Sequence, residues 1–291
     1  MEREHVLRLH NQDYAGAYDE KFFRNPFGNA AIEFEIALLA RLIDGSTTWL
    51  DLGCGTGFVL SRFPGTRRAG LDLSPSMLDK AREANPDAIF LTQGDLIDKF
   101  PEWNGQWSLV TCMWVPYCYL RCMLEFEQFL RNAVSWTAPG GTLFIPTLDL
   151  EDLRPHTVLP YEYDAGPHGG RTLLTSSTWS WIEADGRDVC LHLLAPETAH
   201  FLDLLASDFE TIEVVRYPPF RPGWVSRKAI LARGRHQAGD RCPARVIHHR
   251  IPAPTLSEDS TPTQLPEVST WRLLLELKLR LQRKLQRFWH A

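Results

Sequence analysis

Three aspartates border short apolar segments in the first third of the chain. Asp51 precedes the glycine-rich run 53–57, Asp72 closes the next apolar segment, and Asp95 follows Gly94 behind the third. Carboxylates accept hydrogen bonds from hydroxyl and amino groups, and glycines let the backbone approach a ligand closely. The pattern therefore predicts a binding site for a polar organic molecule that carries such groups.

The glycine run separates two classes of ligand. A dinucleotide-binding turn needs Gly-x-Gly-x-x-Gly/Ala, but the sixth position counted from Gly53 is Phe58, which would obstruct close helix–strand packing. The third glycine comes one residue early, at Gly57. This disfavours a nicotinamide oxidoreductase. It favours S-adenosylmethionine, which has no phosphate and whose ammonium group suits a carboxylate such as Asp51; Asp72 would then accept from ribose and Asp95 from adenine.

Apolar runs that alternate with helical periodicity must position these residues. We expect strands at 48–52, 69–73, 88–92, 107–113 and 142–145, and helices at 30–43, 74–84 and 124–136. Strands alternating with helices form parallel βαβ units in a doubly wound sheet, whose ligands lie at the carboxyl ends of the strands. The pattern predicts an α/β, Rossmann-like fold with the three aspartates at one edge.

The pattern changes after the fifth strand. Segments 172–183 and 188–194 flank Ala184-Asp185-Gly186-Arg187, which indicates a β-hairpin inserted as a flap. A helix at 196–207 and strands at 211–217 and 227–232 follow. We therefore expect a seven-stranded, mostly parallel sheet with an antiparallel last strand, and a domain that extends from residue 1 to 234.

The motifs resemble those of class I S-adenosylmethionine-dependent methyltransferases over roughly residues 14–234. The matching segments are Leu50-Asp51-Leu52-Gly53-Cys54-Gly55-Thr56-Gly57, Gly70-Leu71-Asp72-Leu73-Ser74-Pro75-Ser76-Met77-Leu78, Gln93-Gly94-Asp95-Leu96 and Ala138-Pro139-Gly140-Gly141. The chain looks most similar to small-molecule enzymes such as sugar N,N-dimethyltransferases. The cofactor-binding residues that the motifs and the resemblance indicate are Tyr14, Tyr18, Asp51, Gly53, Cys54, Gly55, Asp72, Leu73, Met77, Gly94, Asp95, Leu96 and Met113, with Tyr14 and Tyr18 in an N-terminal lid.

Methyl transfer is an in-line displacement in which the protein mainly orients the acceptor and excludes water. A general base matters only for a hydroxyl acceptor, and the candidates are Tyr117 and His156, with His168 and Asp149 as further options. We expect transfer to an N or O atom of a sugar, an amine or a natural-product intermediate. The alternative is a non-catalytic S-adenosylmethionine-binding module that acts through its C-terminal helix.

Charge and cysteine content limit the partners and the compartment. Residues 1–234 carry 21 Lys and Arg against 31 Asp and Glu, whereas residues 235–291 carry 10 against 5. An acidic body makes a nucleic-acid substrate improbable. The six cysteines lack zinc-site spacing, and no run is apolar enough to span a membrane, so a cytoplasmic protein with reduced thiols and no metal is expected.

The C-terminal part has a different composition. Residues 235–269 are polar and rich in proline, which predicts a disordered linker. Residues 270–291 place leucines at helical spacing among Lys and Arg, which predicts a basic amphipathic helix. Segment 271–289 would either anchor the protein to a membrane surface or a protein partner, or pack on its own domain or on a second copy.

Overall fold

The computed structural model describes residues 1–24, 26–148, 176–182, 189–217, 227–237, 239–240 and 242–251. Residues Met1–Ala253 form one compact unit, and Pro254–Ala291 form a second that lies outside the described residues. The predicted amphipathic helix, together with His156, His168 and Asp149, also lies outside them. Among the described helices, none has the length and apolarity needed to cross a membrane.

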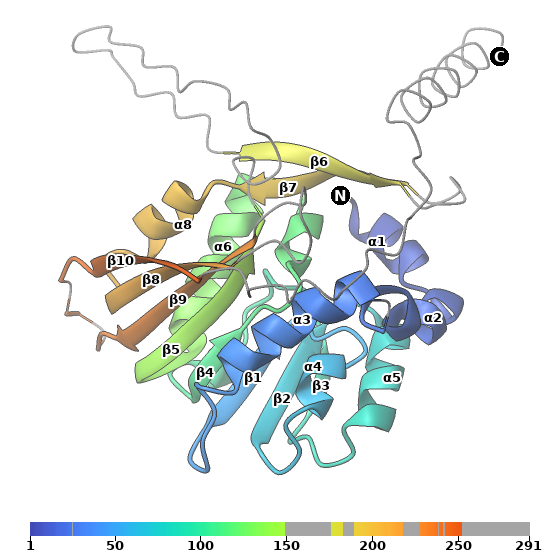
Figure 1. Cartoon of the computed structure of the whole chain (residues 1–291), viewed down its shortest axis with the longest axis horizontal. Coiled ribbons are helices and arrows are strands. Elements are labelled where there is room, and N and C mark those ends of the chain that lie inside the picture. The colour runs from blue at the N-terminus through green and yellow to red at the C-terminus, as the bar shows by residue number, and fades with distance from the viewer. Residues whose placement is uncertain are drawn as a thin grey trace, which may run out of the picture. The chain divides into compact units, whose positions relative to one another are not determined.

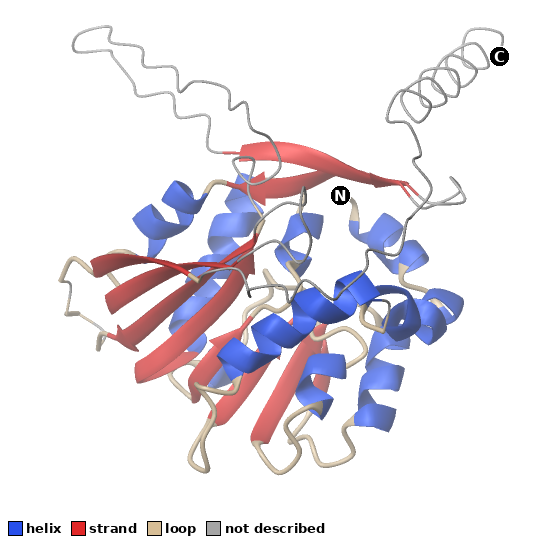
Figure 2. Ribbon diagram, viewed as in Figure 1, coloured by secondary structure: helices blue, strands red, loops and turns tan. Residues whose placement is uncertain are grey.

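Eight strands form one sheet in the order β10-β8-β9-β5-β4-β1-β2-β3 (Figures 1 and 2). They are β1 (Thr48–Leu52), β2 (Arg67–Asp72), β3 (Leu91–Gln93), β4 (Trp107–Thr111), β5 (Thr137–Thr147), β8 (Phe209–Tyr217), β9 (Arg227–Arg235) and β10 (Arg245–Arg250). The five strands from β3 to β5 run parallel, and β9 is antiparallel to both β5 and β8. The parallel half therefore brings five strand tips to one edge.

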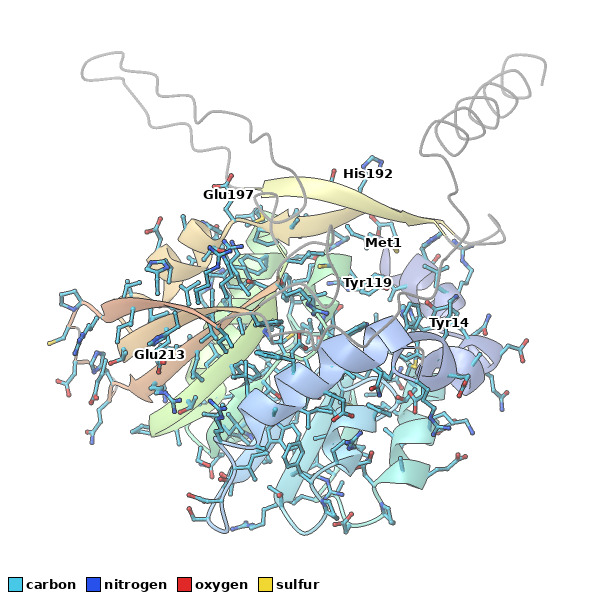
Figure 3. The ribbon with its side chains drawn as sticks, in the orientation of Figure 1. Met1, Tyr14, Tyr119, His192, Glu197 and Glu213 are labelled. Atoms are coloured by element: carbon cyan, nitrogen blue, oxygen red, sulfur yellow. The ribbon has the colours of Figure 1, made fainter. Side chains whose placement is uncertain are left out.

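Helices cover both faces of this sheet, as the doubly wound pattern predicts. The helices are α1 (Arg3–Leu9), α2 (Gln12–Phe22), α3 (Pro26–Leu39), α4 (Phe58–Ser61), α5 (Pro75–Ala84), α6 (Met123–Trp136) and α8 (Thr198–Leu205), with short 3-10 turns at Pro101–Trp103 and Pro116–Tyr119. Figure 1 shows α3 in front of the sheet and α6 behind it. Alternate strand residues face the two helix layers, because Trp49 belongs to the core cluster that contains α3 residues and its neighbour Leu50 to the cluster that contains α6 residues. Figure 3 shows the side chains on this framework, with Tyr14 on α2.

Local capping explains where the helices near the strand tips begin. Ser74 Oγ accepts from Met77 N at 3.2 Å and Pro75 takes the first helical position, so α5 starts directly behind β2. Asn11 Oδ1 accepts from Tyr14 N at 3.0 Å and starts α2 in the same way. These caps fix the turns that border the carboxyl edge of the sheet.

Several predicted features need correction. Among the described residues the main sheet has eight strands rather than the predicted seven, and the additional β10 lies inside the segment predicted as a linker from residue 235. Most side chains of β10 are exposed, and its backbone pairs in parallel with β8, so the strand leaves little periodicity in the sequence. The antiparallel strand β9 lies within the sheet, while the last strand is parallel to its neighbour.

The hairpin and some boundaries also differ in detail. β6 (Ser176–Ile182) pairs antiparallel with β7 (Val189–Pro196) in a separate two-stranded sheet. The fifth strand begins at Thr137, directly after α6, because the turn at Gly140 is absorbed within the strand at a positive φ of 72°. The third strand is confined to Leu91–Gln93 and so begins later than predicted.

Candidate functional site

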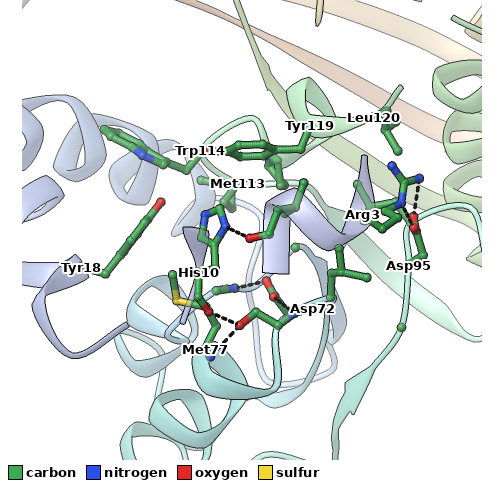
Figure 4. Close-up of a pocket in the computed structure, with 18 residues that line it drawn as sticks. Arg3, His10, Tyr18, Asp72, Met77, Asp95, Met113, Trp114, Tyr119 and Leu120 are labelled. Carbon is green, nitrogen blue, oxygen red and sulfur yellow. Dashed lines mark hydrogen bonds and ion pairs between the residues drawn. The ribbon is translucent and has the colours of Figure 1, made fainter. Parts of the chain in front are cut away.

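A pocket opens at the carboxyl edge of the parallel strands, next to the tips of β1, β2 and β4 and the turn after β3 (Figure 4). Ten of the thirteen predicted cofactor-binding residues line it: Tyr18, Gly53, Gly55, Asp72, Leu73, Met77, Gly94, Asp95, Leu96 and Met113. Tyr14, Asp51 and Cys54 do not. The structure thus brings most of the predicted set together and separates three residues from it.

The glycine turn after β1 has a backbone that only glycine adopts easily. Gly53 has a φ of +72°, and a Cβ there would lie 2.4 Å from Pro116 Cγ. Gly55 has a φ of +56°, and a Cβ there would meet nothing within 4 Å. Gly55 therefore presents bare backbone to the open space of the pocket.

Asp72 joins this turn to the tip of β2. Its Oδ2 accepts from Gly55 N at 2.8 Å, and its Oδ1 accepts from Ser74 N at 2.8 Å. Burial raises the pKa of Asp72, and the hydrogen bonds from Ser74 and Gly55 oppose that rise. Each carboxylate oxygen has a second lone pair, so Asp72 can still accept two hydroxyl groups from a ligand in the pocket.

Asp95 lines the pocket beside a cation that the sequence analysis missed. Arg3 of α1 pairs with both of its oxygens, through Nε to Oδ2 and through Nη2 to Oδ1 at 3.1 Å. Arg3 Nη2 also donates to Glu125 Oε2 on α6 at 2.9 Å. The residue predicted to accept from adenine therefore already has a partner that links three parts of the chain.

Asp51 occupies the core side of the same edge. It is 1% exposed, and its Oδ1 accepts from Thr111 Oγ1 at 2.6 Å, while Trp49 Nε1 donates to the same hydroxyl at 2.8 Å. Burial raises its pKa to about 7. Because Asp51 still belongs to β1, its side chain meets the neighbouring β4 and lies outside the pocket lining.

Cys54 also lies behind the pocket. Its side chain is buried against Gly70 of β2, where a Cβ would come within 2.6 Å of the sulfur. Burial raises the pKa of the thiol well above its ordinary value, which leaves it protonated and unreactive. Its role in the turn is packing, in keeping with the small size of the residue.

The N-terminal helices form one wall. Tyr18 lines the pocket, and burial raises the pKa of its hydroxyl. Tyr14 belongs to the same aromatic cluster, with its ring 5.7 Å from that of Tyr18 and 5.3 Å from His10, but it lies outside the lining. Of the two tyrosines predicted for the lid, Tyr18 lines the pocket and Tyr14 does not.

Eight lining residues are not among the thirteen predicted cofactor-binding residues: Arg3, Val6, His10, Ser74, Trp114, Pro116, Tyr119 and Leu120. Three of them come from α1 and its end, a segment with no strong apolar periodicity. His10 is fixed there because Ser74 Oγ donates to its carbonyl at 2.7 Å and its Nδ1 donates to Val6 O at 2.9 Å. Adjacency to predicted cofactor-binding residues could have indicated two of the eight, because Ser74 follows Leu73 and Trp114 follows Met113 in the sequence.

Tyr117, the described candidate for a general base, is not at the pocket. It is fully buried, its hydroxyl donates to Pro146 O at 3.4 Å, and it accepts from Leu148 N at 3.2 Å. Burial raises its pKa well above the ordinary value. Tyr117 therefore braces the ends of β4 and β5. Within the described ranges, no cluster of three His, Cys, Asp or Glu residues could hold a metal ion.

Comparison with known proteins finds a matching family model and related sequences. Residues 50–141 match the methyltransferase domain family. A dTDP-3-amino-3,6-dideoxy-α-D-glucopyranose N,N-dimethyltransferase from Streptomyces fradiae is 31% identical over 54% of this chain and 60% of its own length. A trans-aconitate 2-methyltransferase from Paracidovorax citrulli is 28% identical over 61% of this chain and 63% of its own length. The chain thus spans about three fifths of these relatives.

Solved structures share the fold at lower sequence identity. DesVI from Streptomyces venezuelae has a TM-score of 0.52 and 22% identity, over 76% of this chain and 98% of that one. The complex of DhpI with SAH has a TM-score of 0.51 and 20% identity, over 80% of this chain and 97% of that one. The α/β architecture predicted from the alternating pattern is therefore confirmed.

Proposed function

We propose that this chain, a member of the methyltransferase domain family with the class I fold, transfers a methyl group from S-adenosylmethionine to an N or O atom of a small molecule. The observation that carries the proposal is the convergence at one pocket of Asp72, the positive-φ glycines and Asp95. The named relatives act on an amino sugar and on trans-aconitate, which supports a small acceptor.

The pocket residues fit the cofactor's chemical groups. Asp72 has lone pairs for the ribose hydroxyls, and Gly55 offers backbone that no side chain covers. Met77 and Leu96 supply apolar lining that suits the base, and Asp95 also lines the pocket. When bound, S-adenosylmethionine supplies a methyl group on a sulfonium, which is already an activated leaving group.

The chain's own contribution to the reaction is to orient the acceptor and to exclude water. The pocket has an aromatic wall made by Trp114, Tyr119 and Tyr18. An amine acceptor must reach this wall in its neutral form, whereas a carboxylate needs no base. A hydroxyl acceptor would need one, and the described residue Tyr117 is too far inside the core to serve.

The direct test is a calorimetric titration of the full chain with S-adenosylmethionine, followed by a transfer assay with labelled cofactor. The acceptor panel contains trans-aconitate, dTDP-linked amino sugars and simple amines. We expect binding in the micromolar range, label in one acceptor class, and the neutral thioether product. The absence of any binding at millimolar cofactor would refute the proposal, and binding without transfer to any small molecule would favour a non-catalytic module.

The matched variants are Asp72→Ala and Asp79→Ala. Asp72→Ala removes an acceptor of ribose hydroxyls and leaves two backbone amides without their partner, so we expect cofactor affinity to fall at least tenfold, about 1.4 kcal/mol. Asp79 lies on the exposed face of α5 and pairs with Arg82, and its loss should leave the affinity within twofold. Equal affinities for the two variants would remove Asp72 from the site.

A further inference from the structure

A buried ion pair lies at the carboxyl edge of the sheet, outside the pocket lining. Glu35 of α3 is fully buried, and its Oε1 receives Arg227 Nη2 at 2.9 Å and the Tyr217 hydroxyl at 2.6 Å. Arg227 is the first residue of β9, opposite Tyr217 at the end of β8. Segments from three distant parts of the chain thus meet next to the site.

Arg227 connects this pair to the pocket. Its guanidinium carbon lies 4.7 Å from the ring centre of Trp114, and the ring of Phe23 packs on the same indole at an interplanar angle of 74°, with ring centres 5.1 Å apart. Trp114 lines the pocket beside Met113, at the end of β4. A cation over an indole face is a directional contact, so the guanidinium constrains the plane of that ring.

The backbone beneath the indole is strained. Trp114 and the β-branched Val115 have φ values of +62° and +57°, a region that such residues rarely adopt. Strained residues persist only where surrounding contacts hold them, and they cluster at functional sites. Arg227 and Phe23 are the ring contacts that the structure gives Trp114 within the described residues.

The ion pair is poorly suited to a purely stabilising role. Arg227 Nε and Glu35 Oε2 are both buried without a hydrogen-bond partner in the described structure. A buried charge pair with unsatisfied atoms costs desolvation that apolar residues of similar volume would avoid. Its presence beside a strained pocket residue points to a geometric task.

We propose that Glu35 and Arg227 are positioning residues that hold Trp114 as the acceptor-side wall of the pocket. Glu35 fixes the direction of the guanidinium, the guanidinium fixes the indole plane, and the indole limits where an acceptor can stand relative to the cofactor. This role rests on the proposed function, since it concerns the acceptor of the same site. It requires no contact between the ion pair and the cofactor.

The first experiment needs no acceptor. Hydrogen exchange is measured on the full chain loaded with S-adenosylhomocysteine, for the wild type, Arg227→Met and the control Arg233→Met. Arg233 lies on the same strand and pairs with Glu213 on the surface. We expect the peptide 112–118 to exchange at least tenfold faster in Arg227→Met, with the rest of the sheet unchanged, and no local change in the control. Unchanged exchange at 112–118, or faster exchange throughout the sheet, would overturn the proposal.

The second experiment uses trans-aconitate and a dTDP-linked amino sugar as acceptor probes. We expect Arg227→Met to lower kcat/KM for the acceptor at least tenfold while the affinity for S-adenosylhomocysteine stays within threefold. The double variant Arg227→Met/Trp114→Phe should lose no more kcat/KM than the more impaired single variant, because both substitutions act on the same wall of the pocket. Additive losses, or a parallel loss of cofactor affinity, would contradict a positioning role.

Two milder variants protect the test against misfolding. Glu35→Gln keeps the size of the side chain but removes the charge that pairs with the guanidinium. Arg227→Lys keeps a cation near the indole but lacks the planar guanidinium group. We expect faster exchange at 112–118 in Glu35→Gln and partial recovery in Arg227→Lys compared with Arg227→Met. If the wild type bound no cofactor, the proposed function would fail, and the exchange comparison on the unliganded chain would still decide the positioning role.

Discussion

The edge of the sheet has a pocket side and a core side, and the same sequence motifs supply both. Asp72 and Gly55 face the pocket, whereas Asp51 and Gly57, which stand in the quoted motifs as well, face the core. Asp72 is held by two backbone amides and keeps free lone pairs, while Asp51 accepts from a hydroxyl that is itself bonded to Trp49. Some residues of these motifs thus line the pocket, while others pack in the core behind it and hold the lining residues in place.

The largest expected effect in a test of this distinction between pocket side and core side concerns the carboxyl group of Asp51. Burial raises the folded-state pKa of Asp51 to about 7, above its unfolded value of 3.8, so the folded state holds this proton more tightly. The group's contribution to the free energy of unfolding is therefore greatest below pH 4 and falls as the pH rises to about 7. The loss is about 4 kcal/mol at most, at about 1.4 kcal/mol per pKa unit.

Asp51→Asn should remove this decline. We expect the free energy of unfolding of the variant, from urea titrations at pH 5 to 8, to rise relative to that of the wild type as the pH increases. Asp44→Asn is the control, since hydrogen bonds lower the pKa of Asp44 and it is ionised in both states over this range. A constant difference between Asp51→Asn and the wild type from pH 5 to 8 would show that Asp51 titrates normally.

The second test compares two glycines of one turn. A Cβ at Gly57, where φ is +72°, would lie 2.4 Å from Asn85 Nδ2 and 3.0 Å from Ala81 Cα. We expect Gly57→Ala to lower the free energy of unfolding by about 3 kcal/mol, from left-handed strain and overpacking together. Gly55→Ala meets no atom within 4 Å, so its stability should fall by only about 1 kcal/mol.

For cofactor affinity we expect the reverse order, with the larger loss in Gly55→Ala and the smaller loss in Gly57→Ala. The methyl group of Gly55→Ala enters the pocket, so calorimetry should record weaker cofactor binding, whereas folded Gly57→Ala should bind nearly as the wild type does. If one of the two variants lost more of both its stability and its cofactor affinity than the other, the distinction between pocket side and core side would be wrong.

Sequence patterns predicted the pocket side better than the core side for a physical reason. The βαβ alternation and the glycine turn fix which strand tips meet, so Asp72, Gly55 and Gly94 could be placed without coordinates. The strand at 48–52 was predicted with the bounds that it has, but the pattern does not reveal that the Asp51 side chain meets Thr111 of the neighbouring β4. Arg3, Trp114 and Arg227 act through contacts between distant segments, and no local spacing encodes those contacts.

The smallest expected effect lies at the far edge of the sheet. β10 pairs with β8 through its backbone, buries little side-chain surface and contributes nothing to the pocket lining. Deleting residues 254–291 should leave the melting temperature and the cofactor affinity unchanged, whereas deleting 240–291 also removes β10. The second deletion should lower the melting temperature by about 3 °C, the scale of about 1 kcal/mol in a domain of this size, with cofactor affinity within twofold. A loss of cofactor binding in either truncated protein would mean that the pocket depends on residues beyond the strand tips, and the division between the two sides of the edge would then be incomplete.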